Sequence, residues 1–176
     1  DSSWNWDIYH KDLGYNASLI FTGDATRSGA FGAEPDSNIF TTKSGYTTYA
    51  DEDYVAYCWS EVESFSKFGN YIGNGLTDGP FVPCGFKPAF VMIKSSSNSG
   101  EHWMMFDNKR DPDNLVLQLL YANLTNTEAD ASGYQDTDFL SNGFKVRQTN
   151  GSVNGSDYEY VFAAFAESPF KYSNAR

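Results

Sequence analysis

Short apolar and aromatic runs alternate with Gly, Asn, Asp and Ser turn signals along the whole chain, and this pattern restricts the fold more than any other feature. Aromatic and β-branched residues suit a half-buried pleated surface, whereas Gly and Asn adopt the positive φ angles of tight turns. No 12-residue stretch has the i, i+3, i+4, i+7 apolar spacing of an amphipathic helix, and the short run 115–120 fits a helix or a strand. The pattern therefore predicts an all-β, antiparallel sandwich.

The apolar runs also predict where the strands lie. Asn-Gly pairs within the punctuation predict tight hairpin turns, among them those at Asn142, Asn150 and Asn154. The expected strands are residues 6–10, 18–22, 38–42, 54–61, 67–72, 81–84, 89–94, 102–107, 115–122, 139–148 and 158–167.

Two parts of the chain resemble each other and indicate a tandem repeat. The matching pairs are WDIYH (6–10) with WMMFD (103–107), Phe40 with Phe144, and YVAYCWSE (54–61) with YVFAAFAE (160–167). The offset between the copies grows from 97 to 106 residues along these pairs. Such a drift places insertions in the turns of the second copy, where a sandwich tolerates them.

The first copy is predicted to be incomplete, because nothing before Trp6 corresponds to residues 66–102. If both copies fold alike, the first lacks about three strands, and bare strand edges promote aggregation unless something pairs with them. We therefore assign residues 1–65 to the C-terminal part of a first sandwich and residues 66–176 to a complete second sandwich with a tail. Upstream residues or a neighbouring subunit are expected to complete the first copy. The alternative is that both copies merge into one larger sandwich.

Charge and hydropathy exclude several classes of partner. Twelve Lys and Arg against 23 Asp and Glu give a net charge of −11. Phosphate binding needs clustered basic side chains, so neither nucleic acid nor an anionic membrane surface is an expected partner. No apolar run approaches the roughly 18 residues of a membrane-spanning helix, so membrane insertion is not expected either. Cys58 and Cys84 are expected to be buried free thiols, with a single disulfide between them as the alternative.

Enzyme signatures are lacking, and the chain is predicted not to be an enzyme. His10 and His102 stand in polar surroundings and are expected at the solvent edge. Glu61 and Glu63 share one face of a strand and so resemble the carboxylate pair of a glycosidase. That role needs a concave, partly apolar site that raises one pKa. We therefore interpret the pair as a solvated strand end.

A short loop offers oxygen ligands of the type that Ca²⁺ prefers, from Asp107, Asp111 and Asp113. The spacing does not match an EF-hand, and Lys109 and Arg110 interrupt it. These carboxylates are weak metal candidates, and no cofactor is predicted.

Saccharide binding needs an exposed aromatic ring beside amide or carboxylate groups. Several loops combine these residue types, although each ring could instead pack against the rim of the sandwich with its hydroxyl in water. The candidate ligand-binding residues are Tyr46, Tyr49, Asn70, Tyr71, Asn74, Tyr134 and Asp136.

Several strings of the second copy resemble a family of virion domains from tailed bacteriophages, common in marine and cyanobacterial phages. They are SKFGNYIGNG (66–75), DGPFVPCGFKPAFVMIK (78–94), DFLSNGFK (138–145) and AFAESPFKY (164–172). Members of this family occur in large virion proteins that are labelled as tail fibre or structural proteins. The similarity covers nearly the whole chain, with a looser match over the first 50 residues.

The resemblance implies a concanavalin-like or laminin-G-like jelly roll on the surface of the phage particle. It further implies that Arg176 is the natural C-terminus and that more sequence lies upstream. Other virion subunits are the implied partners, in a homo-oligomer such as a trimer. The family supplies no catalytic residues.

Two functions follow for the C-terminal module of a tail fibre or similar appendage. The first is adhesion to glycans on the host surface, in which many copies per particle strengthen weak single-site binding. The alternative is a purely structural role, as a capsid decoration, a head fibre or a fibre-assembly module without a ligand.

Overall fold

The fold is built of antiparallel strands, as the turn pattern predicts. The computed structural model describes residues 5–22, 26–130 and 136–167. Within these residues every pair of named strands is antiparallel, and the single helix, α1 (Gly151–Asn154), is one turn long. The predicted all-β fold class is therefore confirmed.

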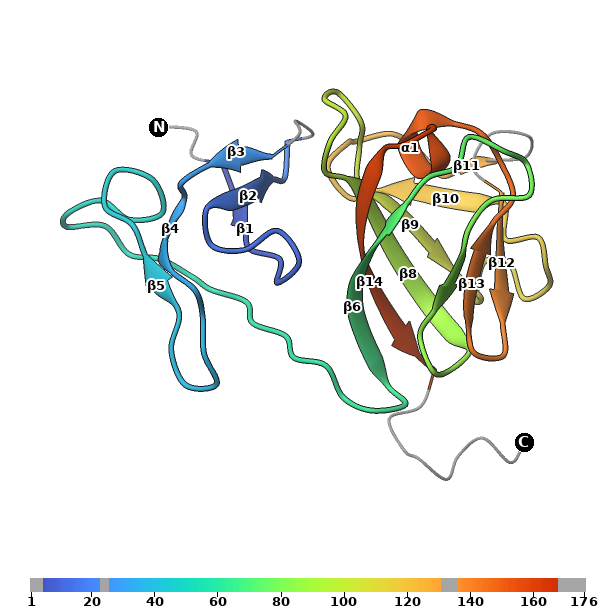
Figure 1. The fold of residues 1–176 in the computed structure, drawn as a ribbon, viewed down its shortest axis with the longest axis horizontal. Coiled ribbons are helices and arrows are strands. Elements are labelled where there is room, and N and C mark those ends of the chain that lie inside the picture. The colour runs from blue at the N-terminus through green and yellow to red at the C-terminus, as the bar shows by residue number, and fades with distance from the viewer. Residues whose placement is uncertain (1–4, 23–25, 131–135, 168–176) are drawn as a thin grey trace.

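The C-terminal part forms a two-layered sandwich (Figure 1). Its larger sheet has six strands in the order β11-β10-β9-β8-β14-β6, and its smaller sheet has three in the order β12-β13-β7. The strands are β6 (Ser66–Ile72), β7 (Phe81–Pro83), β8 (Pro88–Ser95), β9 (Met104–Asp107), β10 (Gln118–Tyr121), β11 (Ala129–Asp130), β12 (Thr137–Leu140), β13 (Gly143–Val146) and β14 (Glu159–Ala166).

The core of the sandwich lies between these two sheets. Successive side chains of a strand point to opposite faces, so Tyr160, Phe162 and Ala164 of β14 all turn inward and are almost fully buried. From the smaller sheet Phe144 meets them, with its ring 5.3 Å from that of Phe162. The alternating apolar residues of β14 therefore join the two layers.

The N-terminal part contains two small sheets, β1-β2-β3 and β4-β5. Leu19 of β2 packs with Trp103 and Val161, on the outer face of the six-stranded sheet. The indole N–H of Trp103 also donates to the Ile20 carbonyl at 3.2 Å. These contacts attach the N-terminal part to the sandwich. The strands are β1 (Asp7–Ile8), β2 (Ala17–Ile20), β3 (Arg27–Ser28), β4 (Phe31–Ala33) and β5 (Thr41–Thr42).

The two parts of the chain use the same strand order, and the sheets β1-β2-β3 and β9-β10-β11 also share a register. The sheet β1-β2-β3 repeats the order of β9-β10-β11, and the hairpin β4-β5 repeats that of β12-β13. The pair Ile8–Leu19 corresponds to Met105–Leu120. In each copy the first tryptophan accepts a matching backbone hydrogen bond, from Phe21 to Trp6 at 3.1 Å and from Ala122 to Trp103 at 3.0 Å.

Burial differs between the two copies even where the backbone agrees. Trp6 is 54% exposed, whereas Trp103 is 6% exposed. The difference arises because β2 of the first copy covers Trp103, with the ring of Phe21 stacked on it at 6.1 Å.

Some local expectations are wrong. Residues 54–61 form no strand, because no neighbouring strand pairs with them among the described residues. The single strand expected at 139–148 is a hairpin that turns at Asn142, between β12 and β13. Asn150 caps α1 instead of making a hairpin, since its side chain accepts from the backbone N–H of Ser152 at 2.8 Å. The short strands β3, β4 and β11 carried no signal in the sequence.

Candidate functional site

The residues proposed for saccharide binding do not form one site. Tyr71 is 8% exposed, its hydroxyl donates to the Val153 carbonyl at 2.7 Å, and its ring stacks on Tyr160 at 4.9 Å. Burial, together with the neighbouring Tyr160, raises the pKa of Tyr71 well above its ordinary value. Tyr71 is thus a core residue, and its ring is not available to a ligand.

The polar members of the proposed set are also occupied by the fold. Asn74 accepts from Asn154 at 3.0 Å and donates to the Asp78 carbonyl at 3.0 Å, so it shapes its own loop. Asp136 is buried and accepts from the Gln148 side chain at 3.0 Å. Asn70 is exposed on β6, which is the edge strand of the large sheet.

Two tyrosines of the set belong to the N-terminal part. Tyr46 is exposed and lies under the Lys43 ammonium at 4.9 Å. Tyr49 donates its hydroxyl to the Gly45 carbonyl at 2.9 Å. Tyr134 lies outside the described residues.

Two of the three proposed metal ligands, Asp107 and Asp111, accept hydrogen bonds within the fold, and the third, Asp113, is exposed. Asp107 accepts from the backbone N–H groups of Lys109 and Arg110 and pairs with the Arg110 guanidinium at 2.6 Å. Asp111 accepts from the backbone N–H groups of Leu117 and Gln118. In the described part of the chain no group of three or more His, Cys, Asp or Glu side chains is placed to hold a metal ion.

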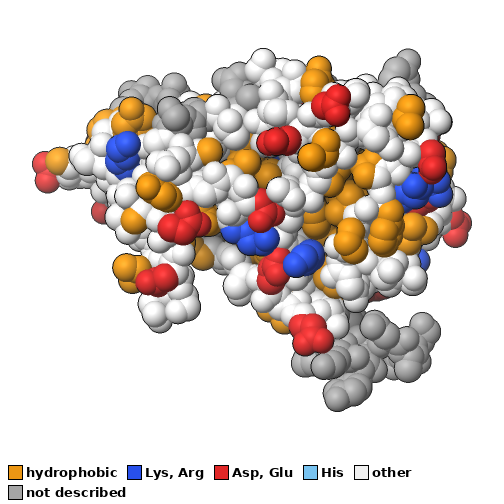
Figure 2. All heavy atoms as spheres, viewed as in Figure 1, with side chains coloured by type: hydrophobic (Ala, Val, Ile, Leu, Met, Phe, Trp, Pro, Cys, Tyr) orange, Lys and Arg blue, Asp and Glu red, His pale blue; other side chains and the backbone are white. Residues whose placement is uncertain are grey.

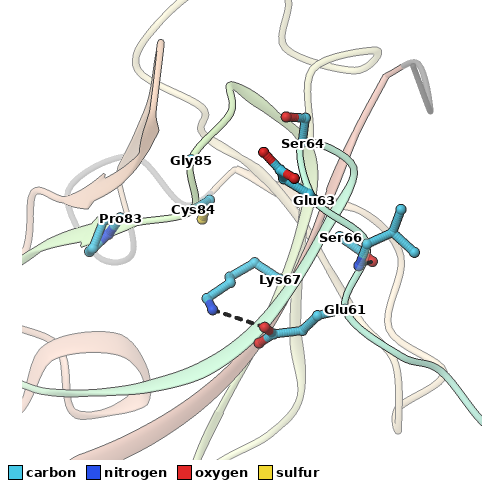
Figure 3. A pocket seen from close by; sticks show the side chains of 9 residues that line it. Glu61, Glu63, Ser64, Ser66, Lys67, Pro83, Cys84 and Gly85 are labelled. Atoms are coloured by element: carbon cyan, nitrogen blue, oxygen red, sulfur yellow. Dashed lines mark hydrogen bonds and ion pairs between the residues drawn. The ribbon is translucent and has the colours of Figure 1, made fainter. Parts of the chain in front are cut away.

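A pocket of about 670 Å³ lies where residues 61–67 turn into β6, and Cys84 and Gly85 line its other side (Figure 3). Glu61 points to Lys67, and their charged atoms are 3.0 Å apart. Glu63 lies on the far side of the turn, beside Ser64. The two glutamates therefore do not face each other across the pocket.

The electrostatics of Glu61 do not suit a general acid. Partial burial opposes ionisation, but the hydrogen bonds from Lys67 and from the Phe68 backbone, with the charges of Lys67 and Lys11, lower the pKa of Glu61. A glycosidase acid needs the opposite shift. Glu61 instead holds the start of β6, since it accepts from the Phe68 backbone N–H at 3.2 Å.

Within the described residues, the most exposed group of aromatic side chains lies outside every site that the sequence predicts. Trp6, Tyr57 and Trp59 form a row in which neighbouring ring centroids are 5.9 and 6.2 Å apart. We call these three residues the aromatic row. Each of them is more than half exposed. The alternation of Tyr57 and Trp59 is visible in the sequence, where it predicts part of a paired strand.

The segment that carries most of this row is exposed throughout. We call residues 54–61 the open segment. Figure 1 shows it running from the end of β5 toward β6 with no strand beside it in this view. Every one of its residues is exposed, and Tyr54 and Val55 are 52% and 66% exposed. Figure 2, in the same view, shows further apolar side chains on the surfaces of both the N-terminal part and the sandwich, with acidic side chains among them.

The two cysteines are both free, which excludes the disulfide alternative. Cys84 is buried as expected, and burial raises its pKa to about 12. Cys58 is exposed, so the expectation of a buried thiol is wrong for this residue. It lies in the open segment, and none of the residues that the structure describes covers it.

We expect Cys58 to react with a maleimide at least about 100-fold faster than Cys84, because reaction at a buried thiol requires local opening. Labelling followed by mass spectrometry of the digested protein measures both rates. The Cys58→Ala variant is the control and should lose the fast phase. Equal rates at the two thiols would contradict the burial of Cys84.

His10 is not a solvent-edge residue, because only 10% of its side chain is exposed. Burial lowers its pKa below the ordinary value of 6.5, although Asp12, the Phe162 backbone and Glu61 act in the opposite direction. Lys11 adds to the lowering.

This burial makes stability depend on pH. Because the pKa is lower in the folded state, stability is fully present above pH 6.5 and decreases as pH falls toward the folded pKa, by up to about 1.4 kcal/mol per pH unit. Urea denaturation at pH 7.5, 6.5 and 5.5 measures the slope. His10→Gln should flatten it, whereas His102→Gln should retain it. A His10→Gln variant with the same slope as the unchanged chain would disprove the effect.

Comparison with known proteins gives one family. The family described as Domain of unknown function (DUF7483) matches residues 1–169, and so covers both parts of the chain. Searches of the curated proteins and of the solved structures find no match. Within the described residues, no helix has the length and hydropathy needed to cross a membrane.

Proposed function

This chain belongs to the family described as Domain of unknown function (DUF7483), and we propose its function from its geometry together with the resemblance of its sequence to virion domains: it is a structural β-sandwich module of a bacteriophage surface appendage. The phage setting rests on the resemblance of the strings at 66–75, 78–94 and 138–145 to virion domains. The structural role rests on the open segment. Other virion subunits are its partners, in an oligomer on the particle surface.

The observation that carries the structural role is an apolar segment without a covering layer. Both faces of the segment are exposed: Tyr54 is 52% exposed on one face, and Val55, Tyr57 and Trp59 are 66%, 65% and 67% exposed on the other. Burying large apolar side chains yields about 1.5–3 kcal/mol each, so such a segment gains most from contact with protein. An exposed strand edge is also a template for pairing with another chain.

Adhesion to a saccharide is the second candidate, and the aromatic row favours it. Amphipathic aromatic rings are the usual binding surface for the apolar faces of sugars, with a polar edge left to hydrogen bonds. The acidic surface and the low pKa of Glu61 provide no support for a third, catalytic role. Converting Glu61 and Glu63 to Gln should leave any turnover of a host polysaccharide unchanged.

Localisation on phage particles tests the proposal directly. Antibodies raised against residues 66–167 should label an appendage or the shell in immunoelectron microscopy of particles that carry the protein. Mass spectrometry of the purified particles should find the chain in several copies per particle. The protein in infected cells but not in purified particles would refute a virion role.

A glycan array separates the two candidates. Adhesion predicts binding of the recombinant chain to host polysaccharides, and loss of that binding in Tyr57→Ala and Trp59→Ala. The matched control is Phe81→Ala, because Phe81 of β7 is 42% exposed but belongs neither to the aromatic row nor to the residues proposed for saccharide binding. Absence of binding across host polysaccharides favours the structural role.

A further inference from the structure

The open segment corresponds to β14, the strand of the six-stranded sheet that lies between β8 and β6. In the second copy the Gly155 backbone N–H donates to the Tyr160 hydroxyl at 2.7 Å. In the first copy the Tyr49 backbone N–H donates to the Tyr54 hydroxyl at 2.8 Å. Both contacts span five residues, and they align Tyr54 with Tyr160. Residues 54–61 therefore hold the position of β14 in the repeat.

In the second copy β14 has a strand on each side. It pairs with β6 from Glu159–Ile72 to Phe165–Ser66, and with β8 from Tyr160–Ser95 to Ala166–Pro88. The open segment has neither neighbour among the described residues. Two further edges are bare in the same way. The edge of β1 corresponds to the edge of β9 that pairs with β8, and the edge of β5 corresponds to the edge of β13 that pairs with β7.

The side chains of the open segment have the pattern of a buried strand. Tyr160, Phe162 and Ala164 are 0%, 4% and 0% exposed, and the corresponding Tyr54, Ala56 and Cys58 are all exposed. This face of the segment would become core if a neighbouring sheet covered it. The bare edges and this bare face are thus all accounted for if the first copy lacks the counterparts of β6, β7 and β8.

We propose that the open segment is a docking site for a three-stranded segment built like residues 66–95. A strand of the β8 type inserts between β1 and the open segment, and a strand of the β6 type pairs with its other edge. A strand of the β7 type pairs with β5. The proposal rests on the structural role proposed above and names the partner of that role.

Other occupants fit the bare surface less well. If two copies of this chain paired through their open segments, each segment would gain one neighbour and keep its other edge bare, and β1 and β5 would remain uncovered. A saccharide can cover rings but cannot continue the backbone ladder. A segment built like β6, β7 and β8 would pair with all the bare edges at once, as residues 66–95 do in the second copy.

A duplicated segment tests the proposal in the full chain. A second copy of residues 66–102 is placed directly before Trp6. The His102 of this duplicate is then followed by Trp6, as His102 of the original chain is followed by Trp103. The duplicate carries Cys84→Ser, so that Cys58 and the original Cys84 are the only thiols. Docking should slow maleimide labelling of Cys58 about 100-fold, because the residue becomes a core position. Hydrogen exchange of the backbone amides of residues 54–61 should slow with it.

The matched control is the same fusion with Val91→Asp and Ile93→Asp in the duplicate only. Both residues are fully buried in β8, so charged side chains there prevent docking against the core face. This control should label at the rate of the unfused chain. Unchanged Cys58 labelling in the first fusion would overturn the proposal. So would faster labelling of the original Cys84, which would show that the duplicate displaces the native strands instead.

The remaining occupants are tested with the unfused chain. Protection of Cys58 that rises with protein concentration would identify a second copy as the occupant and overturn the proposal. Protection by a host polysaccharide would do the same. If the duplicated segment does not dock but the antibody still labels the particles, the proposed partner is wrong and the virion role stands. If the duplicated segment docks but the antibody does not label the particles, the virion role is wrong and the proposed partner stands.

Discussion

Replacing Phe144 with alanine lowers the free energy of unfolding by about 3–5 kcal/mol, the range for removing a buried aromatic ring. Phe144 is 0% exposed and joins the two layers of the sandwich through edge contacts with Tyr71 at 6.0 Å and Phe162 at 5.3 Å. The cavity cannot close easily, because strands of both sheets hold its walls. Urea denaturation followed by far-ultraviolet circular dichroism measures the loss.

The matched control is Phe40→Ala. Phe40 is the counterpart of Phe144 in the first copy, and it is 46% exposed. Removing it should change the free energy of unfolding by no more than about 0.5 kcal/mol, as for most surface substitutions. Similar losses for the two variants would mean that the first copy already has a closed core, which contradicts its exposure in the structure.

Replacing Trp103 with alanine has the second large effect, because it breaks the attachment of the N-terminal part to the sandwich. The change removes a 6% exposed ring, its stacking on Phe21 and its hydrogen bond to the Ile20 carbonyl. We expect a loss of about 3–5 kcal/mol in the unfolding of the N-terminal part. Limited proteolysis should then cut residues 5–62 at least about 10-fold faster, while the sandwich stays intact.

Trp6→Ala is the control for this variant. Trp6 occupies the same position in the first copy and makes the same backbone hydrogen bond, but its ring is 54% exposed. We expect less than about 1 kcal/mol of destabilisation and little change in proteolysis. If cleavage of the N-terminal part accelerated equally in both variants, the packing of β2 on Trp103 would not be what holds the two parts together.

The sequence predicted the elements whose residues alternate strongly. The aromatic and β-branched runs of β6, β8, β9 and β14 all predict strands, and their local pattern agrees with their place in the sheet. It did not predict β3 (RS), β4 (FGA) and β11 (AD), because none of them lies in a longer run of alternating apolar residues, whereas the equally short β1, β5 and β7 lie within longer expected strands. Residues 54–61 have the same alternation as β14 but remain unpaired, which shows that a strand needs a neighbour as well as a pattern.

The candidate site was less predictable than the fold. Tyr71 and Asp136 are of the residue types that bind sugars, but the structure buries them both. Trp6 and Tyr57 are far apart in the sequence, and their rings lie 5.9 Å apart in the fold. Neither outcome follows from residue type, because burial depends on which segments of the chain meet.

Local chemistry in the sequence was therefore sufficient for the fold class, the turn at Asn142 and the correspondence between the copies at Trp6 and Trp103. Backbone preferences and apolar alternation act within a few residues, so they can be read from the chain alone. The exposure of Cys58, the burial of His10 and the bare edges of the open segment depend on contacts between distant strands. These features became visible only in the folded arrangement, because hydrogen-bonded ladders and packed cores form between segments whose meeting no local signal records.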